Sequence, residues 1–162
     1  MRSFHHEHWR FPNPTMWLAV ALVFSFSLSA AAELGGDVSS VLTDQARMKA
    51  TVKSTESRSY TVQELKDPSG TVVREYVSPE EKVFAVAWQG PFLPNLRDLL
   101  GQYFTAYSKA LQAAKARHPG RGPVNIQQPG LVVQSGGHAR AFTGRAYLPS
   151  LMPQGVQAEE IR

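Results

Sequence analysis

The chain of 162 residues contains no cysteine. This absence excludes disulfide bonds, a thiol nucleophile, cysteine-ligated zinc, iron–sulfur clusters and lipid attachment at a cysteine. An exported protein is free to form disulfide bonds, because its compartment is oxidising. If this protein is exported, its folded state must therefore rest on packing alone.

Histidine is scarce in the part of the chain that is expected to fold. Three of the five histidines, His5, His6 and His8, lie at the amino terminus, and only His118 and His138 follow. These last two are 20 residues apart, in separate predicted loops. No spacing typical of zinc ligands is present. We therefore predict no metal site and no cofactor.

A strong charge of one sign is also missing. The first 32 residues hold two of the 17 basic and one of the 13 acidic residues, which leaves a net charge of +3 on the remainder. That charge is spread along the chain and falls short of the basic patch typical of nucleic-acid-binding proteins. We predict no nucleic-acid partner and at most weak peripheral contact with anionic surfaces.

The chain has one long hydrophobic run, residues 16–32, which are uncharged. Arg2 and Arg10 precede this run, and Ala30-Ala31-Ala32 ends it. A basic segment, an apolar segment and small residues before a cleavage point are typical of a secretory signal peptide. The alternative is a retained membrane anchor, for which 17 residues thinned by three serines are marginal against a hydrocarbon core of about 30 Å.

We therefore predict a signal peptide over residues 1–32, cleaved after Ala32. Residues 33–162 are then a single globular domain of ordinary size, exported to the periplasm or secreted. Residues 33–44, rich in glycine and serine, are predicted to be a loosely held lead-in, and residues 40–50 a short helix.

Alternating and β-branched runs predict strands in the rest of the domain. They lie at residues 50–57, 60–65, 71–77, 82–88, 124–127, 131–134 and 138–147. Short turns separate them, among them Asp67-Pro68-Ser69-Gly70 and Gly136-Gly137. Such short connections favour an antiparallel meander. Residues 82–88 are apolar on both faces, which is typical of a central strand covered above and below.

The clearest helix follows this central strand, with apolar residues every three or four positions from Leu96 to Ala114. Asn95 is placed to cap its start, and Pro119-Gly120 ends it. Gly101 costs about 1 kcal/mol inside a helix relative to alanine, so we expect it where the helix approaches the sheet closely. The predicted fold is α+β: an antiparallel sheet of about five or six strands with one long amphipathic helix packed on a face. A last short helix is expected at residues 158–161.

Five segments together carry a family resemblance. They are residues 34–35, 68–76, 84–91, 96–104 and 131–149. On these segments the chain resembles an exported bacterial family catalogued as domain of unknown function number 2844. The resemblance implies a small, leader-bearing envelope or secreted protein of Gram-negative bacteria. It implies no activity, cofactor or catalytic residue that could be transferred to this chain.

The sequence offers few candidates for catalysis. Ser135 and His138 could form a nucleophile and base, but Ser135 lacks the G-x-S-x-G setting, and residues three apart across two glycines fit the ends of a hairpin turn. The adjacent acids Glu80-Glu81 and Glu159-Glu160 could divide acid and base roles, yet lie in a predicted turn and a polar tail. We therefore predict no catalytic residue.

Two segments are candidates for binding. Lys115, Arg117, His118 and Arg121 could meet an anionic partner, although charges that complement a helix terminus explain most of them. The stronger candidate is the junction of the central strand and the helix, where we predict a binding site formed by Trp88, Gln89 and Phe92.

Bulky aromatic residues most often pack in cores, so the alternative for this junction is that Trp88 and Phe92 close the core. The leading hypothesis for the whole protein is a non-enzymatic binding module of the cell envelope. It would contact an envelope component or a protein through this junction or a sheet edge. The alternative is a small hydrolase acting on envelope polymers, with a site assembled only by the fold.

Overall fold

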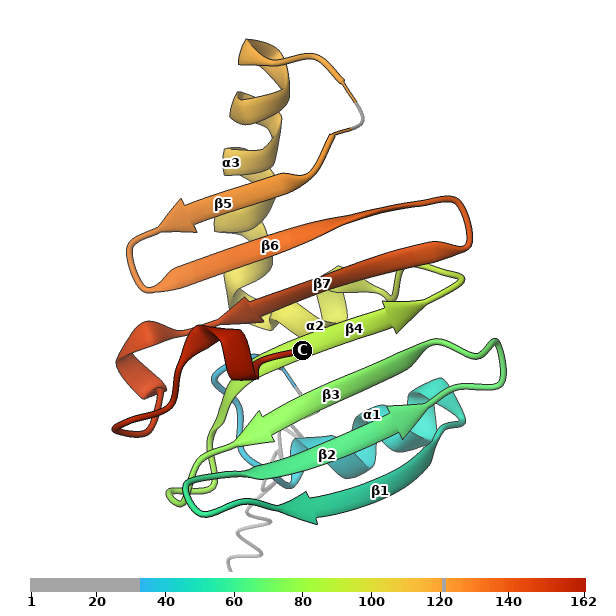
Figure 1. Cartoon of the computed structure of the whole chain (residues 1–162), viewed down its shortest axis with the longest axis vertical. Coiled ribbons are helices and arrows are strands. Elements are labelled where there is room, and N and C mark those ends of the chain that lie inside the picture. Colours follow the sequence, from blue (N-terminus) through green and yellow to red (C-terminus); the bar gives the residue numbers. More distant parts are fainter. Residues whose placement is uncertain (1–32, 121) are drawn as a thin grey trace, which may run out of the picture.

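A computed structural model describes residues 33–120 and 122–162, which form a seven-stranded antiparallel sheet with helices on one face (Figure 1). The predicted α+β class and antiparallel sheet are confirmed, with one strand more than the upper expectation. The predicted signal peptide lies outside the described residues. No helix among the described residues is long and apolar enough to span a membrane.

The sheet consists of two meanders joined through the helices. Its strands are β1 (Thr51–Glu56), β2 (Thr61–Lys66), β3 (Val72–Val77), β4 (Val83–Gly90), β5 (Val124–Gln128), β6 (Leu131–His138) and β7 (Ala141–Tyr147). The spatial order is β1-β2-β3-β4-β7-β6-β5. After β4 the chain passes through the helices to the far edge, so β7 returns to pair with β4 at the centre.

The predicted helices are present. They are α1 (Ser40–Met48), α2 (Leu96–Leu100), a 3₁₀ turn (Gly101–Tyr103) and α3 (Phe104–Arg117). Asn95 caps α2 as expected, since its side chain accepts a hydrogen bond from the Arg97 N–H at 3.1 Å. The long helix is interrupted at Gly101, whose φ is +49°.

The expected reason for Gly101 is wrong. A Cβ atom at this position would collide with the Glu33 side chain rather than with the sheet. Glycine is required here because its positive φ turns the helix and because the absent side chain makes room for Glu33.

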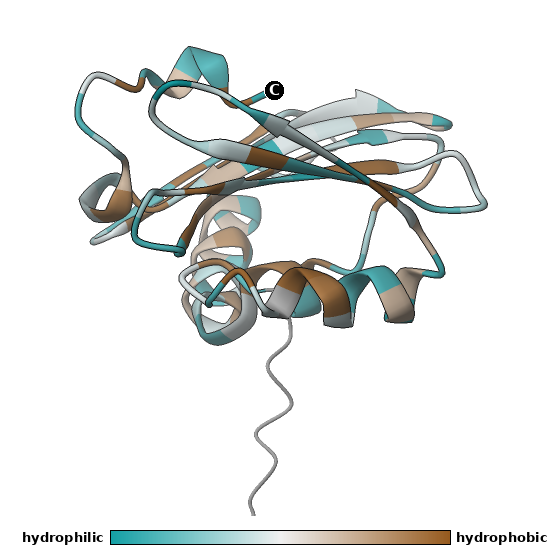
Figure 2. Cartoon of the chain, turned by 90° about the horizontal axis from the view of Figure 1, so that it is seen from below, coloured by the Kyte–Doolittle hydropathy of each residue, from teal (hydrophilic) through white to brown (hydrophobic). Residues whose placement is uncertain are grey.

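The central strand β4 is covered on both faces, as predicted. The helices pack on one face, which we call the helix-covered face, and the carboxy-terminal segment lies on the other, which we call the open face (Figure 2). Val86 and Trp88 face the helices, where they join a core with Leu100 of α2. Phe84 and Ala87 belong to a second apolar cluster on the open face.

The carboxy-terminal segment, residues 149–162, contains two single 3₁₀ turns, Pro149–Leu151 and Ala158–Glu160. The second turn stands where a short helix was expected. Ile161 is 1% exposed and anchors the segment among Tyr76 and Phe84. The segment thus lies across the sheet instead of trailing from it (Figure 1).

Two local predictions are wrong. The lead-in is held firmly: Leu34 is fully buried, and its N–H donates to the Leu99 carbonyl at 3.0 Å. The glycine pair Gly136-Gly137 is not a turn, because β6 continues through it to His138. The turn lies at Ala139-Arg140, between the paired residues His138 and Ala141.

Candidate functional site

The three residues of the predicted binding site are not all brought together, although Trp88 and Gln89 both border one hollow of about 410 Å³. Trp88 is 1% exposed in the core of the helix-covered face. The Trp88 indole fills a space left by Gly144 on the neighbouring strand β7. A Cβ atom at Gly144 would overlap the Trp88 ring. Phe92 is 60% exposed beyond the end of β4. Gln89 is exposed and lines two hollows on the open face.

The larger hollow at Gln89, about 560 Å³, is called here the open-face hollow. Strands β1 to β4 form its floor, and the carboxy-terminal segment forms one wall. Its lining residues are Lys53, Thr55, Tyr60, Val62, Glu64, Arg74, Tyr76, Gln89, Glu160 and Arg162. Its volume lies within the range of about 300–1,000 Å³ that is usual for ligand pockets.

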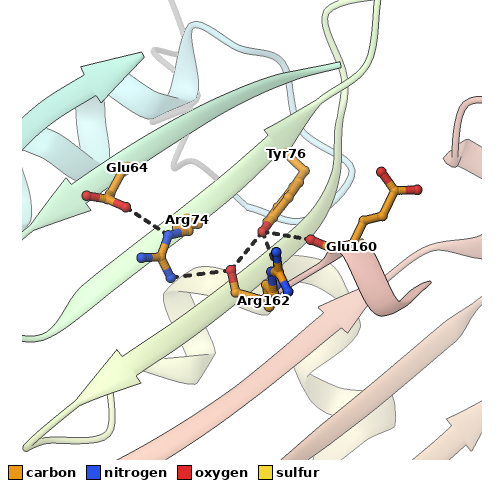
Figure 3. A network of polar contacts seen from close by, with 5 residues as sticks. All are labelled: Glu64, Arg74, Tyr76, Glu160 and Arg162. Atoms are coloured by element: carbon orange, nitrogen blue, oxygen red, sulfur yellow. Dashed lines mark hydrogen bonds and ion pairs between the residues drawn. The ribbon is translucent and has the colours of Figure 1, made fainter. Parts of the chain in front are cut away.

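A polar network fixes the wall of this hollow (Figure 3). The Tyr76 hydroxyl accepts a hydrogen bond from the Arg162 N–H at 2.9 Å and lies 2.9 Å from the Arg162 carbonyl. Arg74 donates from Nε to Glu64 Oε2 at 2.8 Å and from Nη1 to the Arg162 carbonyl at 3.3 Å. Side chains on β3 therefore hold the main chain of the last residues in place.

A second arginine, Arg145 on β7, holds the same segment from the other side. Its Nε donates to Gln134 Oε1 at 2.8 Å, and its Nη1 donates to the carbonyls of Ala158 and Ile161. Next to it lies a second hollow of about 420 Å³ over β5, β6 and β7, and Arg162 lines this hollow as well. The segment thus separates two hollows on one face of the sheet.

In the open-face hollow the side-chain carboxylates have partners among the described residues, whereas two of the cations do not. Both of its carboxylates have partners: Glu64 pairs with Arg74, and Glu160 accepts hydrogen bonds from the Tyr60 hydroxyl and the Gln157 N–H. Burial, followed by the hydrogen bond to Glu160, raises the pKa of Tyr60, which keeps the phenol neutral. The remaining cations, the exposed side chains of Lys53 and Arg162, make no hydrogen bond or ion pair with another described residue.

The helix-covered face holds a pair of acids that sequence reasoning missed. Asp44 of α1 is 2% exposed and Glu75 of β3 is fully buried. Apart from the Arg47 guanidinium, whose Nη2 lies 2.8 Å from Asp44 Oδ1, no donor of a described residue reaches the four carboxyl oxygens. A hydrogen bond between the two carboxyl groups therefore requires a proton on one of them.

Desolvation by burial is the largest cause of the raised pKa values of Asp44 and Glu75. It raises the pKa of Asp44 to about 6, against the lowering effect of Arg47. It also raises the pKa of Glu75 well above its usual value, and the nearby Asp44 charge acts in the same direction. Both carboxyl groups therefore keep a proton to higher pH than exposed carboxyl groups do.

The other sequence candidates are dispersed. Ser135 and His138 both belong to β6, where their odd spacing sends the side chains to opposite faces. Glu80 and Glu81 are exposed in the turn before β4. Within residues 33–120 and 122–162, no three histidine or acidic side chains are grouped so that they could hold a metal ion.

The basic candidates lie at the end of α3. Lys115, Arg117 and His118 are exposed there, and Arg121 lies outside the described residues. Lys115 and His118 line a hollow of about 440 Å³ between the helix end and β5. This group is well separated in the fold from the open-face hollow, since it adjoins the opposite edge of the sheet.

Comparison with protein families identifies the chain. A family model described as protein of unknown function (DUF2844) matches residues 30–161. The chain belongs to this family. No curated protein and no solved structure matches it. Membership confirms the resemblance seen on the five sequence segments.

A sequence signal existed for some of the residues that were missed. In β3, Val73, Glu75 and Val77 share one face, so a lone acid between two valines already pointed to an unusual environment. Arg74 and Tyr76 share the other face by the same alternation. Nothing in the sequence indicated that residues 158–162 lie against them, because that contact spans 84 to 88 positions.

Proposed function

We propose that this protein is exported and binds an anionic, hydroxyl-rich component of the bacterial cell envelope in the open-face hollow. The observation that carries this proposal is the pair of unengaged cations, Lys53 and Arg162, in a polar hollow of about 560 Å³ whose carboxylates already have partners. A carboxylate or phosphate group of a ligand would complement these two side chains.

The rest of the lining suits a ligand rich in hydroxyl groups. The Gln89 amide offers both a donor and an acceptor, and the Thr55 hydroxyl offers both as well. The partly exposed ring of Tyr60 supplies an apolar surface beside these polar groups. An acidic saccharide presents hydroxyl groups, a carboxylate and apolar ring faces, and it is the class of ligand that we infer.

Binding of an acidic oligosaccharide to the full chain, produced in a Gram-negative host, tests the proposal. Oligogalacturonate is the probe, and maltohexaose is its neutral counterpart. Calorimetry is expected to detect the first and not the second, with affinity falling as salt rises. Lys53→Gln together with Arg162→Gln should lower the affinity at least roughly tenfold, by about 1.4 kcal/mol.

A matched control separates the hollow from overall charge. Lys109→Gln with Lys115→Gln removes the same charge from α3, and Lys115 belongs to the other basic group. This variant should bind like the unaltered protein. Equal losses in both variants, or a loss in the α3 variant alone, would contradict the open-face site. So would an absence of oligogalacturonate binding by the folded protein.

The hydrolase alternative gains little support from the geometry. The buried acids are the nearest approach to a catalytic pair, and Asp44 lines a hollow of only about 100 Å³ with Asp98. Glu75 is not among the residues that line it. A polymer segment needs a larger cleft, on the scale of about 300 Å³ or more.

Export is proposed from the sequence alone. The basic, apolar and small-residue layout of residues 1–32 supports it. Amino-terminal sequencing of the protein from a Gram-negative host should find Glu33 or a near neighbour as the first residue. Finding Met1, or an intact residue 16–32 run on membrane-bound protein, would contradict cleavage.

A further inference from the structure

Helix α1 is attached to the sheet by apolar contacts that lie beside two buried acids. Val41 of α1 and Ala50, just beyond the helix, pack on Leu65 of β2 in a small cluster, and Met48 of α1 contacts both this cluster and the main core. Beside this cluster, Asp44 and Glu75 place two carboxyl groups against each other in the interface between α1 and β3. The two carboxyl groups thus lie where α1 meets the sheet.

The charged groups around the pair favour a bound proton. Arg47, on α1, is a cation that contacts it, and Arg47 also pairs with Asp98 of α2 at 2.9 Å. The Glu33 carboxylate, before α1, adds a further negative charge that acts on Asp44. With every group ionised, the partly exposed Arg47 would face four carboxylates, of which Asp44 and Glu75 are buried, and this arrangement is unfavourable.

We propose that Asp44 and Glu75 form a proton-operated latch, which docks α1 on the sheet while the two carboxyl groups share a proton and releases α1 when that proton is lost. In the docked state a proton held between the two carboxyl groups removes one of their charges, and Arg47, which lies 2.8 Å from Asp44, balances the other. Loss of the proton leaves two adjacent carboxylates that water must solvate, and solvation requires the helix to move away.

The direction of the pH dependence follows from the raised pKa values of both acids. A carboxyl group whose pKa is higher in the docked state than in the open state favours docking at lower pH. That advantage decreases as pH rises from about 4, the usual value for exposed carboxyl groups, and it is lost progressively through the Asp44 pKa of about 6 and then through the higher pKa of Glu75. The latch therefore closes in acid and opens toward alkaline pH.

Helix α1 is suited to local opening. It has nine residues, its amino-terminal cap Ser39 makes no side-chain hydrogen bond, and it contributes nothing to the ladders of the sheet. Its release would expose Leu65 while leaving all seven strands paired. Isolated helices of this length are marginal in water, so the released segment should also lose its helical hydrogen bonds.

Hydrogen exchange on the full chain tests the latch. Exchange of the amides of residues 41–48 is measured at pH 5.5 and pH 8.0, each corrected for the intrinsic chemical rate at that pH. The corrected rates should be roughly tenfold or more higher at pH 8.0, since tenfold corresponds to one unit of pKa difference. Amides of β3 and β4 should show no such change.

Glu75→Gln removes one of the two ionisations and keeps a side chain that can donate to Asp44, so it should reduce the pH difference in residues 41–48. Glu80→Gln, in an exposed turn, is the matched control and should leave the difference unchanged. If Glu75→Gln fails to fold, Asp44→Asn serves the same purpose. Equal protection of α1 at both pH values, a difference as large in Glu75→Gln as in the unaltered protein, or simultaneous loss of protection in β3 and β4 would overturn the proposal.

Discussion

The two faces of the sheet are covered by different chemistry. On the helix-covered face, side chains such as Trp88 and Leu100 are buried against one another with few polar contacts. On the open face, Arg74, Tyr76 and Arg145 hold the last residues of the chain by their main-chain carbonyls. The first face stabilises the domain by burial, and the second leaves polar hollows on both sides of a narrow covering segment.

The comparison shows why stability and binding can be separated in this small domain. Apolar burial contributes roughly in proportion to the area removed from water, so continuous helices suit a core. Hydrogen bonds contribute less each, but they fix positions and orient donors around an accessible space. We therefore expect substitutions on the helix-covered face to change stability most, and substitutions on the open face to change the hollows and the segment beside them.

The largest expected effect is on the helix-covered face. Trp88→Ala should lower the free energy of unfolding by about 3–5 kcal/mol, because it empties a fully enclosed aromatic site. Urea unfolding followed by far-ultraviolet circular dichroism measures the change. A variant nearly as stable as the unaltered protein would show that the enclosure of the indole contributes little.

The second prediction concerns Ile161, which anchors the carboxy-terminal segment on the open face. Ile161→Ala should cost about 2–4 kcal/mol, less than the change at Trp88, since a smaller side chain is removed from between Tyr76 and Phe84. The same urea titration gives the value, and limited proteolysis should show faster cleavage within residues 149–162. Unchanged cleavage would mean that the polar contacts alone hold the segment.

The third prediction concerns the acids that the helices cover. Because burial raises the pKa of Asp44 from its ordinary value of 3.8 to about 6, the folded state binds protons more tightly than the unfolded state between these values. The free energy of unfolding should then fall by about 1–3 kcal/mol as pH rises from 4.5 to 7.5. Asp44→Asn should make the profile shallower, and a wild-type profile that rises over this range would contradict the buried pair.

The smallest effect is expected at the polar contacts of the open face. Tyr76→Phe keeps the ring and removes the hydroxyl that accepts from the Arg162 N–H. The expected loss is about 0.5–1.5 kcal/mol, typical of one or two hydrogen bonds. A thermal or urea titration measures it. A loss as large as that of Trp88→Ala would show that the polar network, and not burial, dominates the stability of this face.

Much of the fold was accessible from local patterns. The alternation in β2 and β3, the turn at Asp67-Pro68-Ser69-Gly70 and the two-sided apolar character of β4 each depend on neighbouring residues, and the structure agrees with them. The prediction of a turn at Gly136-Gly137 was wrong, because glycines also occur inside strands, where close packing or a positive φ requires them. Gly137, with φ of +110°, is such a case.

The candidate site was accessible only in part. Gln89 is exposed, whereas Trp88 is buried on the other face, because successive residues of a strand point to opposite faces, and Phe92 lies beyond the end of β4. The cations and aromatic rings that accompany Gln89 come from β1, β2, β3 and the last residues of the chain. No local pattern joins segments so far apart.

The sequence by itself determined the strands, the helices, their order and the family to which this protein belongs, since these depend on periodicity, turn residues and segments read along the chain. Only the tertiary structure decided that β7 pairs with β4, that residues 158–162 cross the open face, and that Asp44 meets Glu75. These contacts join residues 31 to 88 positions apart and follow from the global packing of the sheet, so a reading of neighbouring residues cannot specify them.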